Sequence, residues 1–180
     1  MHNPSPSPHA PLLRTDRLVL TGHRPADLDG LAAMWGDPRV YAGIGGQPRP
    51  REEVWIRLLR SIGTWTAFGY GSWVVRETAD GPPLGEVGLI EAKRAIDPPL
   101  TATETGWTLS PERHGRGYAR EAMAAVLGWA DAQGMARTQC IIDPGNAASI
   151  RLATVLGYVR HGEARYHDRA ILCFERIAAG

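Results

Sequence analysis

Hydrophobic and polar positions in the first third of the chain follow a pattern that predicts one strand and then two helices. Residues 17–23 carry Leu18 and Leu20 at alternate positions, which is the two-residue period of a strand. In residues 25–35 the apolar positions recur every three or four residues, as on one face of a helix. A loop rich in glycine and proline follows, and a second, short helix is expected at residues 52–62.

The middle of the chain predicts an antiparallel meander followed by one long helix. Three apolar-rich segments, residues 72–77, 84–92 and 101–110, are separated by turns that contain Pro, Gly or Asp, so consecutive strands are expected to pair. From residue 116 to residue 133 the apolar positions return to helical spacing, and Gly134 is the expected stop signal.

The last third of the chain predicts a strand, a helix and a closing hairpin. Residues 138–143 form an apolar run of strand length, and Asn146 is a candidate N-cap for a helix that ends at Gly157. Strands are expected at residues 158–163 and 169–176. A meander followed by a strand–helix–strand crossover predicts one mixed α/β domain with helices packed on a sheet.

Length and composition fit one globular domain. Residues 1–11, rich in Pro, Ser and His, are expected to form a disordered tail, and residues 12–180 the domain. The formal net charge of +1 gives no general reason to expect nucleic acid or a membrane as a partner. Every basic residue except Lys93 is arginine, which we attribute to a coding bias, so a single arginine is a weak sign of function.

The cysteines and the apolar runs indicate a cytoplasmic protein. Cys140 and Cys173 lie in strand-like apolar runs without metal-binding spacing, and both are predicted to be buried thiols. The start of the chain lacks the basic and apolar regions of a signal peptide, and no apolar run is long enough to span a bilayer. A reducing cytoplasm is therefore the expected location.

The stretch RHGRGYAREAM, residues 113–123, places two glycines where the long helix begins. The N–H groups of residues 115–119 would lie at a helix N-terminus, where they have no intrahelical partner and attract anions. Gly115 and Gly117 would let a phosphate ester approach the backbone, and Arg116 would add a charged contact. A glycine-rich turn with only a structural role remains the alternative. Neither a nucleotide-binding P-loop nor a dinucleotide-binding glycine motif occurs in the chain.

The segment WTLSPERHGRGYAREAM resembles the coenzyme A-binding segment of the GNAT acetyltransferase superfamily, with its glycine motif at residues 114–119. RTDRLVL at residues 14–20, WGDPRV at 35–40 and NAASIRLATVLGY at 146–158 resemble the RimJ/RimL branch, typified by bacterial ribosomal-protein N-terminal acetyltransferases. The resemblance covers residues 14–176. It implies a mixed, mostly antiparallel sheet of about seven strands with a splayed central pair, flanked by about four helices.

The resemblance also implies where acetyl-coenzyme A would bind as a co-substrate. It would lie between the splayed strands 101–110 and 138–143, with its diphosphate on the N–H groups of residues 115–119 and its pantetheine along the first strand. The binding residues implied are Thr108, Leu109, Ser110, His114, Gly115, Arg116, Gly117, Tyr118, Ala119 and Asn146. His114 departs from the family's Gln or Arg, which makes its charge depend on pH.

Acetyl transfer to an amine needs a proton acceptor, an oxyanion stabiliser and a proton for the departing thiolate. Glu104 is the preferred proton acceptor, acting through a water molecule, and Glu86 is the second choice. The alternative for Glu104 is a solvent-exposed charge on a strand without a catalytic role. The resemblance suggests the Leu109 N–H, at a bulge of the strand, for the oxyanion. Ala153 occupies the position where many family members carry the acidic tyrosine, and the branch's serine is Ser149. Ser149 and Asn146 are also candidates for helix capping.

The expected activity is acetyl-coenzyme A-dependent transfer of an acetyl group to a primary amine, either a protein N-terminal α-amine or a small molecule. The alternative is a catalytically silent coenzyme A-binding sensor or assembly subunit, suggested by Ala153 and His114. A homodimer is compatible with the branch, and no metal is expected.

The polar cluster near the final hairpin is expected to border the acceptor site: His161, Tyr166, His167 and Asp168. The aromatic residues near the early helices are expected in the core or a groove wall: Trp35, Tyr41, Trp55 and Trp65.

Overall fold

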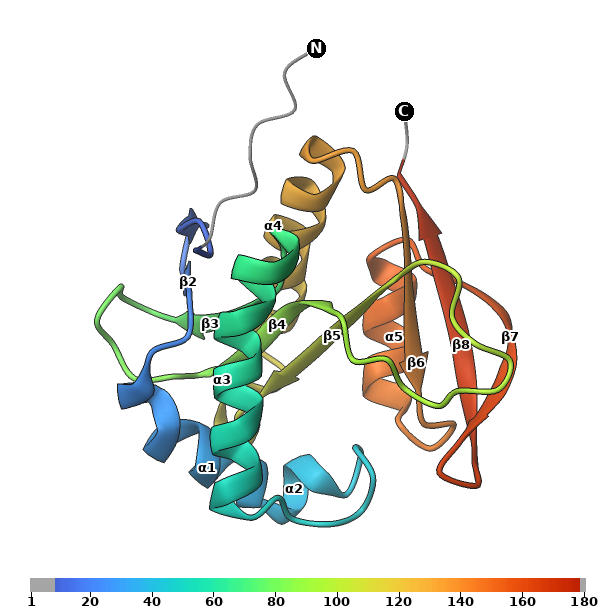
Figure 1. The fold of residues 1–180 in the computed structure, drawn as a ribbon, viewed down its shortest axis with the longest axis horizontal. Coiled ribbons are helices and arrows are strands. Elements are labelled where there is room, and N and C mark those ends of the chain that lie inside the picture. Colours follow the sequence, from blue (N-terminus) through green and yellow to red (C-terminus); the bar gives the residue numbers. More distant parts are fainter. Residues whose placement is uncertain (1–8, 179–180) are drawn as a thin grey trace.

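The computed structural model describes residues 9–178, in which helices pack on both faces of an eight-stranded sheet (Figure 1). The strands are β1 (Leu13–Arg14), β2 (Val19–Thr21), β3 (Ser72–Arg76), β4 (Gly85–Ile90), β5 (Thr103–Leu109), β6 (Arg137–Ile142), β7 (Val159–Tyr166) and β8 (Arg169–Ile177). The α-helices are α1 (Leu28–Gly36), α2 (Pro38–Tyr41), α3 (Arg51–Phe68), α4 (Tyr118–Ala132) and α5 (Ala147–Val155). Two short 3-10 turns, η1 (Pro25–Asp27) and η2 (Pro111–Arg113), precede α1 and α4.

The sheet has the order β1-β2-β3-β4-β5-β6-β8-β7, and every neighbouring pair is antiparallel except β5 with β6. This confirms the expected mixed, mostly antiparallel sheet. The strand that sequence patterning did not predict is β1, which is too short to show a period. The predicted helix at residues 52–62 extends to Phe68, because Trp65 packs edge-on against Trp73 and Trp129 and continues the apolar face.

The two central strands separate after a short parallel contact. β5 and β6 pair only at Thr103 with Thr138 and at Glu104 with Gln139, so the rest of each strand diverges from the other. Tyr158 lies at the base of this gap, where its buried hydroxyl hydrogen-bonds Thr105 at 2.7 Å and Thr138 at 2.8 Å. These hydroxyls satisfy one another where the backbone ladder has ended. The expected splayed pair is therefore confirmed.

The main hydrophobic core lies between the sheet and α4, where Met123, Val126 and Leu127 are fully buried. A second cluster joins α1, α2 and α3 on the other face, which Figure 1 shows with α3 in front of the sheet and α4 behind it. Positive-φ glycines follow α4 and α5 at Gly134 and Gly157, as expected for helix stops. The strand residues between these two layers can therefore reach either face.

Most of the predicted tail, residues 1–8, lies outside the described residues. The last of its positions, Pro11, accepts a hydrogen bond from Trp73 Nε1 at 2.7 Å, so ordered contacts of the domain begin before residue 12. Cys140 and Cys173 are free and buried, as predicted. None of the helices in residues 9–178 combines the length and the apolar character needed to cross a membrane.

Candidate active site

The loop before α4 presents a row of free backbone N–H groups. Gly115 and Gly117 adopt φ values of +71° and +76°, a left-handed conformation that glycine adopts without steric penalty. The N–H groups from Gly115 to Ala119 donate no hydrogen bond within residues 9–178. A Cβ at Gly115 would meet no atom within 4 Å, so the space above the loop is open. This arrangement suits an anion such as a diphosphate.

The N-terminal segment holds this loop in place. Arg17 donates to the Arg116 carbonyl at 2.9 Å, and its guanidinium lies 4.7 Å from the centre of the Tyr118 ring. The same side chain binds Glu121 in the first turn of α4, and Thr15 donates to that carboxylate at 2.5 Å. These contacts explain why the segment RTDRL lies beside the glycine loop.

A groove of about 390 Å³, which we call the α4 groove, collects most of the predicted binding residues. Nine of the predicted residues line it: Thr108, Leu109, His114, Gly115, Gly117, Tyr118, Ala119, Asn146 and Ser149. Three arginines that sequence reasoning missed also line it: Arg39, which pairs with Asp37 and Glu112, Arg113, which pairs with Glu77, and Arg120. Arg120 follows Gly117 by three residues, which is about one helical turn, and this spacing could have identified it as a residue of the groove wall.

Two predicted binding residues do not line the α4 groove. The Arg116 side chain folds over the Tyr118 ring, 5.1 Å from its centre, and only the backbone of this residue belongs to the loop. The Ser110 N–H is used by the Leu84 carbonyl at 2.8 Å. Tyr118 is itself buried and donates its hydroxyl to Glu77, so its N–H rather than its side chain faces the groove.

The backbone of β5 exposes alternate residues to the gap between the splayed strands. The Ser110 N–H donates to the Leu84 carbonyl of the neighbouring chain segment, and the register of the β4–β5 pair does not shift. Because backbone groups alternate in direction along a strand, the N–H and C=O of Thr108, two residues earlier, also face β4. Trp107 and Leu109 then turn their N–H and C=O groups toward the β6 side. The bulge expected at Leu109 is not found: ordinary strand alternation, rather than a bulge, directs its N–H into the gap.

His114 and Trp107 complete the wall of the groove. His114 Nε2 lies 2.9 Å from the Leu109 carbonyl, so the ring is tied to the end of β5. Trp107 donates its indole N–H to Ser149 Oγ at 3.2 Å across the gap. Sequence analysis missed Trp107; its place two residues before Leu109 on the same strand face is the signal that could have found it.

Asn146 and Ser149 divide the capping and polar roles at the start of α5. The Asn146 side chain accepts from the Ser149 N–H at 3.0 Å, which confirms it as the N-cap, and donates to the Gly43 carbonyl at 3.3 Å. The Ser149 hydroxyl oxygen accepts from Trp107, so its own O–H remains available to donate. Ala153 is fully buried in the core and offers no acidic group.

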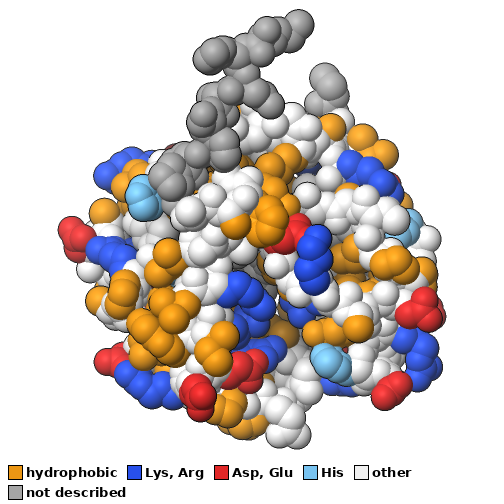
Figure 2. Space-filling model, in the orientation of Figure 1, with side chains coloured by type: hydrophobic (Ala, Val, Ile, Leu, Met, Phe, Trp, Pro, Cys, Tyr) orange, Lys and Arg blue, Asp and Glu red, His pale blue; other side chains and the backbone are white. Residues whose placement is uncertain are grey.

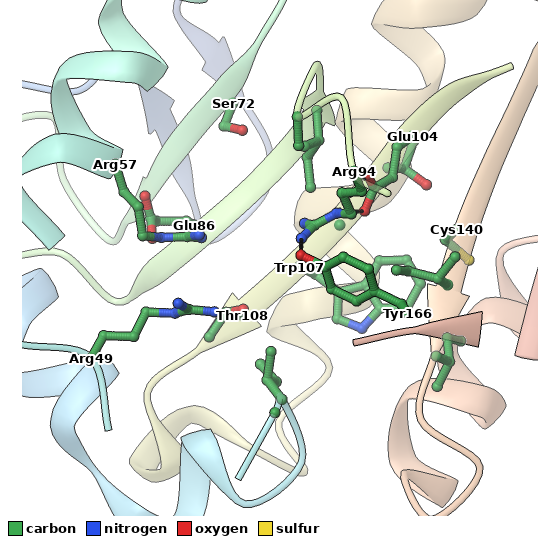
Figure 3. A pocket seen from close by; sticks show the side chains of 18 of the residues that line it. Arg49, Arg57, Ser72, Glu86, Arg94, Glu104, Trp107, Thr108, Cys140 and Tyr166 are labelled. Carbon is green, nitrogen blue, oxygen red and sulfur yellow. Dashed lines mark hydrogen bonds and ion pairs between the residues drawn. The ribbon is translucent and has the colours of Figure 1, made fainter. Parts of the chain in front are cut away.

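A larger cavity of about 860 Å³, the central cavity, adjoins the α4 groove and shares Trp107, Asn146 and Ser149 with it. Its wall includes Trp35, Arg57, Glu86, Arg94, Glu104 and Tyr166. Figure 2 shows basic side chains in the hollow at the middle of this face, and Figure 3 shows Arg49, Arg57 and Arg94 extending into the cavity from opposite sides. A molecule in this cavity could thus reach one held in the α4 groove.

Glu104 lines the central cavity as an ion pair. Arg94 Nε contacts both of its carboxylate oxygens, at 3.0 and 2.9 Å, and Arg94 also donates to the Tyr166 hydroxyl at 3.3 Å. Burial raises the pKa of Glu104, and the pairing with Arg94 opposes this rise without cancelling it. Glu104 is therefore not the solvated strand carboxylate considered as the alternative.

Glu86, the second candidate for proton transfer, is committed to structural contacts. His23 Nε2 lies 2.7 Å from one carboxylate oxygen, and Trp35 Nε1 donates to the other at 2.7 Å. Burial alone would raise its pKa, but the hydrogen bond and charge of His23, the charge of Arg57 and the Trp35 bond lower it to about 2. Such a carboxylate is a very weak proton acceptor, which favours Glu104 over Glu86 for this role.

The hairpin between β7 and β8 borders the central cavity, as expected for part of the polar cluster. Tyr166 and His167 line the cavity, whereas the exposed His161 and Asp168 do not. Within residues 9–178 there is no group of three or more His, Cys, Asp or Glu side chains arranged to hold a metal ion. Of the predicted aromatic residues, Trp65 is in the core and Trp35 is both buried and part of the cavity wall.

Comparisons with known proteins agree with this geometry. The family profile of the acetyltransferase (GNAT) domain matches residues 17–159. The YkkB protein of Bacillus subtilis (strain 168) is 28% identical over 169 residues, which cover 91% of this chain and 94% of YkkB. The structure of a GNAT-family acetyltransferase from Bordetella pertussis is 30% identical, with a TM-score of 0.79 over 93% of this chain and 99% of that one.

A ribosomal-protein-S5-alanine acetyltransferase from Vibrio fischeri shares the fold, with a TM-score of 0.74, 20% identity and coverage of 93% of this chain and 97% of that one. The residues present fit acetyl-coenzyme A, because the free N–H groups, the open glycine loop and the outward-facing backbone of β5 lie along one groove. The chain belongs to the GNAT acetyltransferases of the RimJ/RimL type, a family of acetyl-coenzyme A-dependent N-acetyltransferases.

Proposed function

We propose that this protein transfers an acetyl group directly from acetyl-coenzyme A to a primary amine bound in the central cavity. The observation that carries the proposal is the meeting of the two cavities at the Trp107–Ser149 pair. A donor in the α4 groove and an acceptor in the central cavity would meet there without an acetylated protein intermediate. Holding both reactants together is itself a large catalytic effect.

Acetyl-coenzyme A supplies the activated thioester. The N–H groups of Gly115 to Ala119 would hold its diphosphate, supported by the charge of Arg120, which forms no ion pair among the described residues. The backbone of Trp107 would pair with pantetheine in the manner of an added strand, since the Leu109 carbonyl is already in contact with His114. The Leu109 N–H faces the gap and would stabilise the oxyanion of the tetrahedral intermediate.

Glu104 is the proposed proton acceptor. Among the cavity carboxylates with clear pKa shifts, Glu86 and Glu91 are lowered, the latter by hydrogen bonds from Lys93 and Tyr70, whereas Glu104 is raised. Each Glu104 oxygen keeps a lone pair beyond its contact with Arg94, so a bridging water can deliver the ammonium proton. The free nitrogen lone pair then attacks the carbonyl carbon.

Ser149 is the proposed proton relay for the leaving thiolate. As the C–S bond breaks, its O–H donates to the sulfur and regains a proton from solvent, while the Trp107 N–H keeps the hydroxyl oriented. Cys140, also on the cavity wall, is unsuited to carry the acetyl group. It is buried, and burial raises its thiol pKa well above the ordinary value, so it holds little thiolate.

The experiment is a steady-state assay of free thiol release from acetyl-coenzyme A with a panel of amines, including peptides with free N-termini and small primary amines. Direct transfer predicts intersecting double-reciprocal lines when both substrates are varied. Parallel lines would contradict direct transfer, because they indicate an acetylated enzyme. Tight coenzyme A binding by calorimetry without turnover on any amine would instead support the silent sensor.

A further inference from the structure

The central cavity contains cations that its own carboxylates do not neutralise. Four of its basic side chains form ion pairs within the wall: Arg49 with Glu53, Lys93 with Glu91, Arg94 with Glu104 and Arg169 with Asp143. Arg57 and Arg60, from consecutive turns of α3, have no ion pair among the described residues. The part of the cavity next to α3 therefore carries an excess of positive charge.

Arg57 is the most constrained of these cations. Its guanidinium lies 4.5 Å from the centre of the Trp35 ring, and the Arg49 guanidinium lies 5.1 Å from the same ring. Arg57 Nε is buried and has no hydrogen-bond partner among the described residues. A buried N–H without an acceptor is unfavourable by more than an ordinary hydrogen bond, so the Arg57 side chain, which lines the cavity, is suited to an external acceptor.

The carboxylate of Glu86 does not satisfy Arg57. Glu86 attracts it through space, yet the two Glu86 oxygens are already bonded to His23 and Trp35. Burial, together with the charges of Arg49, Arg60 and Arg94, lowers the pKa of Arg57 to about 10. Arg57 is still charged at neutral pH, so it is a fixed cation beside a Trp wall.

From this geometry, and resting on the proposed function, we infer that the acceptor is a primary amine that also carries an anionic group, a carboxylate or phosphate, bound by Arg57. A planar guanidinium matches either anion through paired N–H donors. Contact with the Trp35 ring restrains the Arg57 guanidinium before the ligand arrives, which limits the entropy lost on binding. The same charges repel a polyamine, whose second ammonium group would lie against α3.

The test compares related amines with and without an anionic group. Glycine is paired with glycinamide and phosphoethanolamine with ethanolamine, with putrescine as the dication, and kcat/KM is measured by thiol release. We expect the anionic member of at least one pair to be preferred by about 10-fold or more, the value of one charged hydrogen bond. The pair that responds distinguishes carboxylate from phosphate. Equal or better use of the neutral amines and putrescine would overturn the inference.

The variant Arg57→Gln should remove that preference, lowering kcat/KM for the anionic amine by about 10- to 100-fold and for its neutral partner by much less. Arg57→Lys, which keeps the charge, should retain part of the preference and also serves if Arg57→Gln folds poorly. Arg151→Gln, an exposed arginine of α5 outside both cavities, is the matched control. An unchanged preference in Arg57→Gln would overturn the inference.

Failure of this inference and failure of the proposed function give different results. If no amine of any charge is acetylated, the proposed function fails and the inference falls with it. If neutral amines are acetylated as well as anionic ones, the function stands and only the anion site is wrong. Calorimetry with coenzyme A shows whether the α4 groove is intact, and Arg57→Gln should bind coenzyme A as the unchanged protein does.

Discussion

Arg17 binds Glu121 through its Nε at 2.7 Å, although the two residues lie 104 positions apart in the sequence. Through Nη1 the same arginine also bonds the Arg116 carbonyl, so one side chain fixes the start of α4 relative to the loop before it. A row of backbone donors is an effective anion site only when its geometry is fixed before the ligand arrives. Arg17 is therefore a positioning residue for the α4 groove.

Replacing Arg17 with Ala should weaken coenzyme A binding without removing a contact to the ligand. We expect the Kd to rise by about 10-fold, or ~1.4 kcal/mol, because the loop loses its anchor. Isothermal calorimetry measures the change. Arg14→Ala, in the exposed neighbouring strand, is the control and should bind as the unchanged protein does. Equal Kd values for both variants would show that the loop does not depend on Arg17.

Gly117 and Gly128 provide a contrast within one helix. Gly117 is the N-cap of α4 at φ +76°, where an L side chain is strained, so Gly117→Ala should lower the free energy of unfolding by ~1–2 kcal/mol and weaken coenzyme A binding. Gly128 lies exposed inside the helix, and a Cβ added there would meet no atom within 4 Å, so Gly128→Ala should raise stability by ~0.5–1 kcal/mol. Urea denaturation tests both, and a stabilised Gly117→Ala would contradict the backbone argument.

Local pattern predicted the types of most elements, because strand and helix periods are set by residues close in sequence. Gly134 and Gly157 were recognisable as stops for the same reason. The length of α3 was underestimated, since the final turns depend on the contact of Trp65 with Trp73 and Trp129, which local propensity does not contain. β1 consists of two residues and has no period to detect.

The site shows the same division between local and distant information. The glycine loop and Asn146 were predictable because anion binding and capping depend on adjacent residues. The Arg57 environment was not, since Trp35, Arg49 and Glu86 come from other elements and every arginine is weak evidence in so arginine-rich a chain. The family resemblance brought the segments together, but it did not indicate which carboxylate was free to accept a proton.

Ser149 and Asn146 are adjacent in space, but substitutions at the two positions should have different effects. Ser149→Ala removes a hydroxyl that does not cap α5, so kcat should fall by about 10-fold with little change in stability. Asn146→Ala removes the cap and should lower the free energy of unfolding by ~1 kcal/mol. Thiol-release kinetics and urea denaturation of both variants separate the effects. A Ser149→Ala enzyme with unchanged kcat would exclude the proposed proton relay.

Glu86 should make the fold sensitive to acid. Its folded pKa of about 2 lies below the ordinary value of 4.5, so its contribution to stability is present above pH 4.5 and is lost as pH falls toward 2. Glu86→Gln should be less stable at pH 7 and should show a smaller loss over that interval. Denaturation at several pH values measures this, with the exposed Glu163→Gln as control. Parallel acid profiles for Glu86→Gln and the unchanged protein would refute the assignment.

Glu104 should control the rate rather than the stability at low pH. Because burial raises its pKa, the carboxylate becomes protonated at a higher pH than an ordinary glutamate, and the rate should fall as pH decreases through that value. Glu104→Gln keeps a polar partner for Arg94 but cannot accept a proton, so kcat should fall by about 100-fold or more. The fall in rate at low pH, which is the acidic limb of the pH–rate profile, should disappear in this variant.

The matched control for Glu104 is Glu91→Gln in the same cavity wall, where Lys93 and Tyr70 already hold the carboxylate and lower its pKa. Its pH–rate profile should keep the acidic limb of the unchanged protein. A full pH profile of kcat/KM for the three proteins decides between the two carboxylates. If Glu104→Gln retains the limb while Glu91→Gln loses it, the proton leaves the amine through Glu91, and the burial that raises the pKa of Glu104 serves only to hold Arg94.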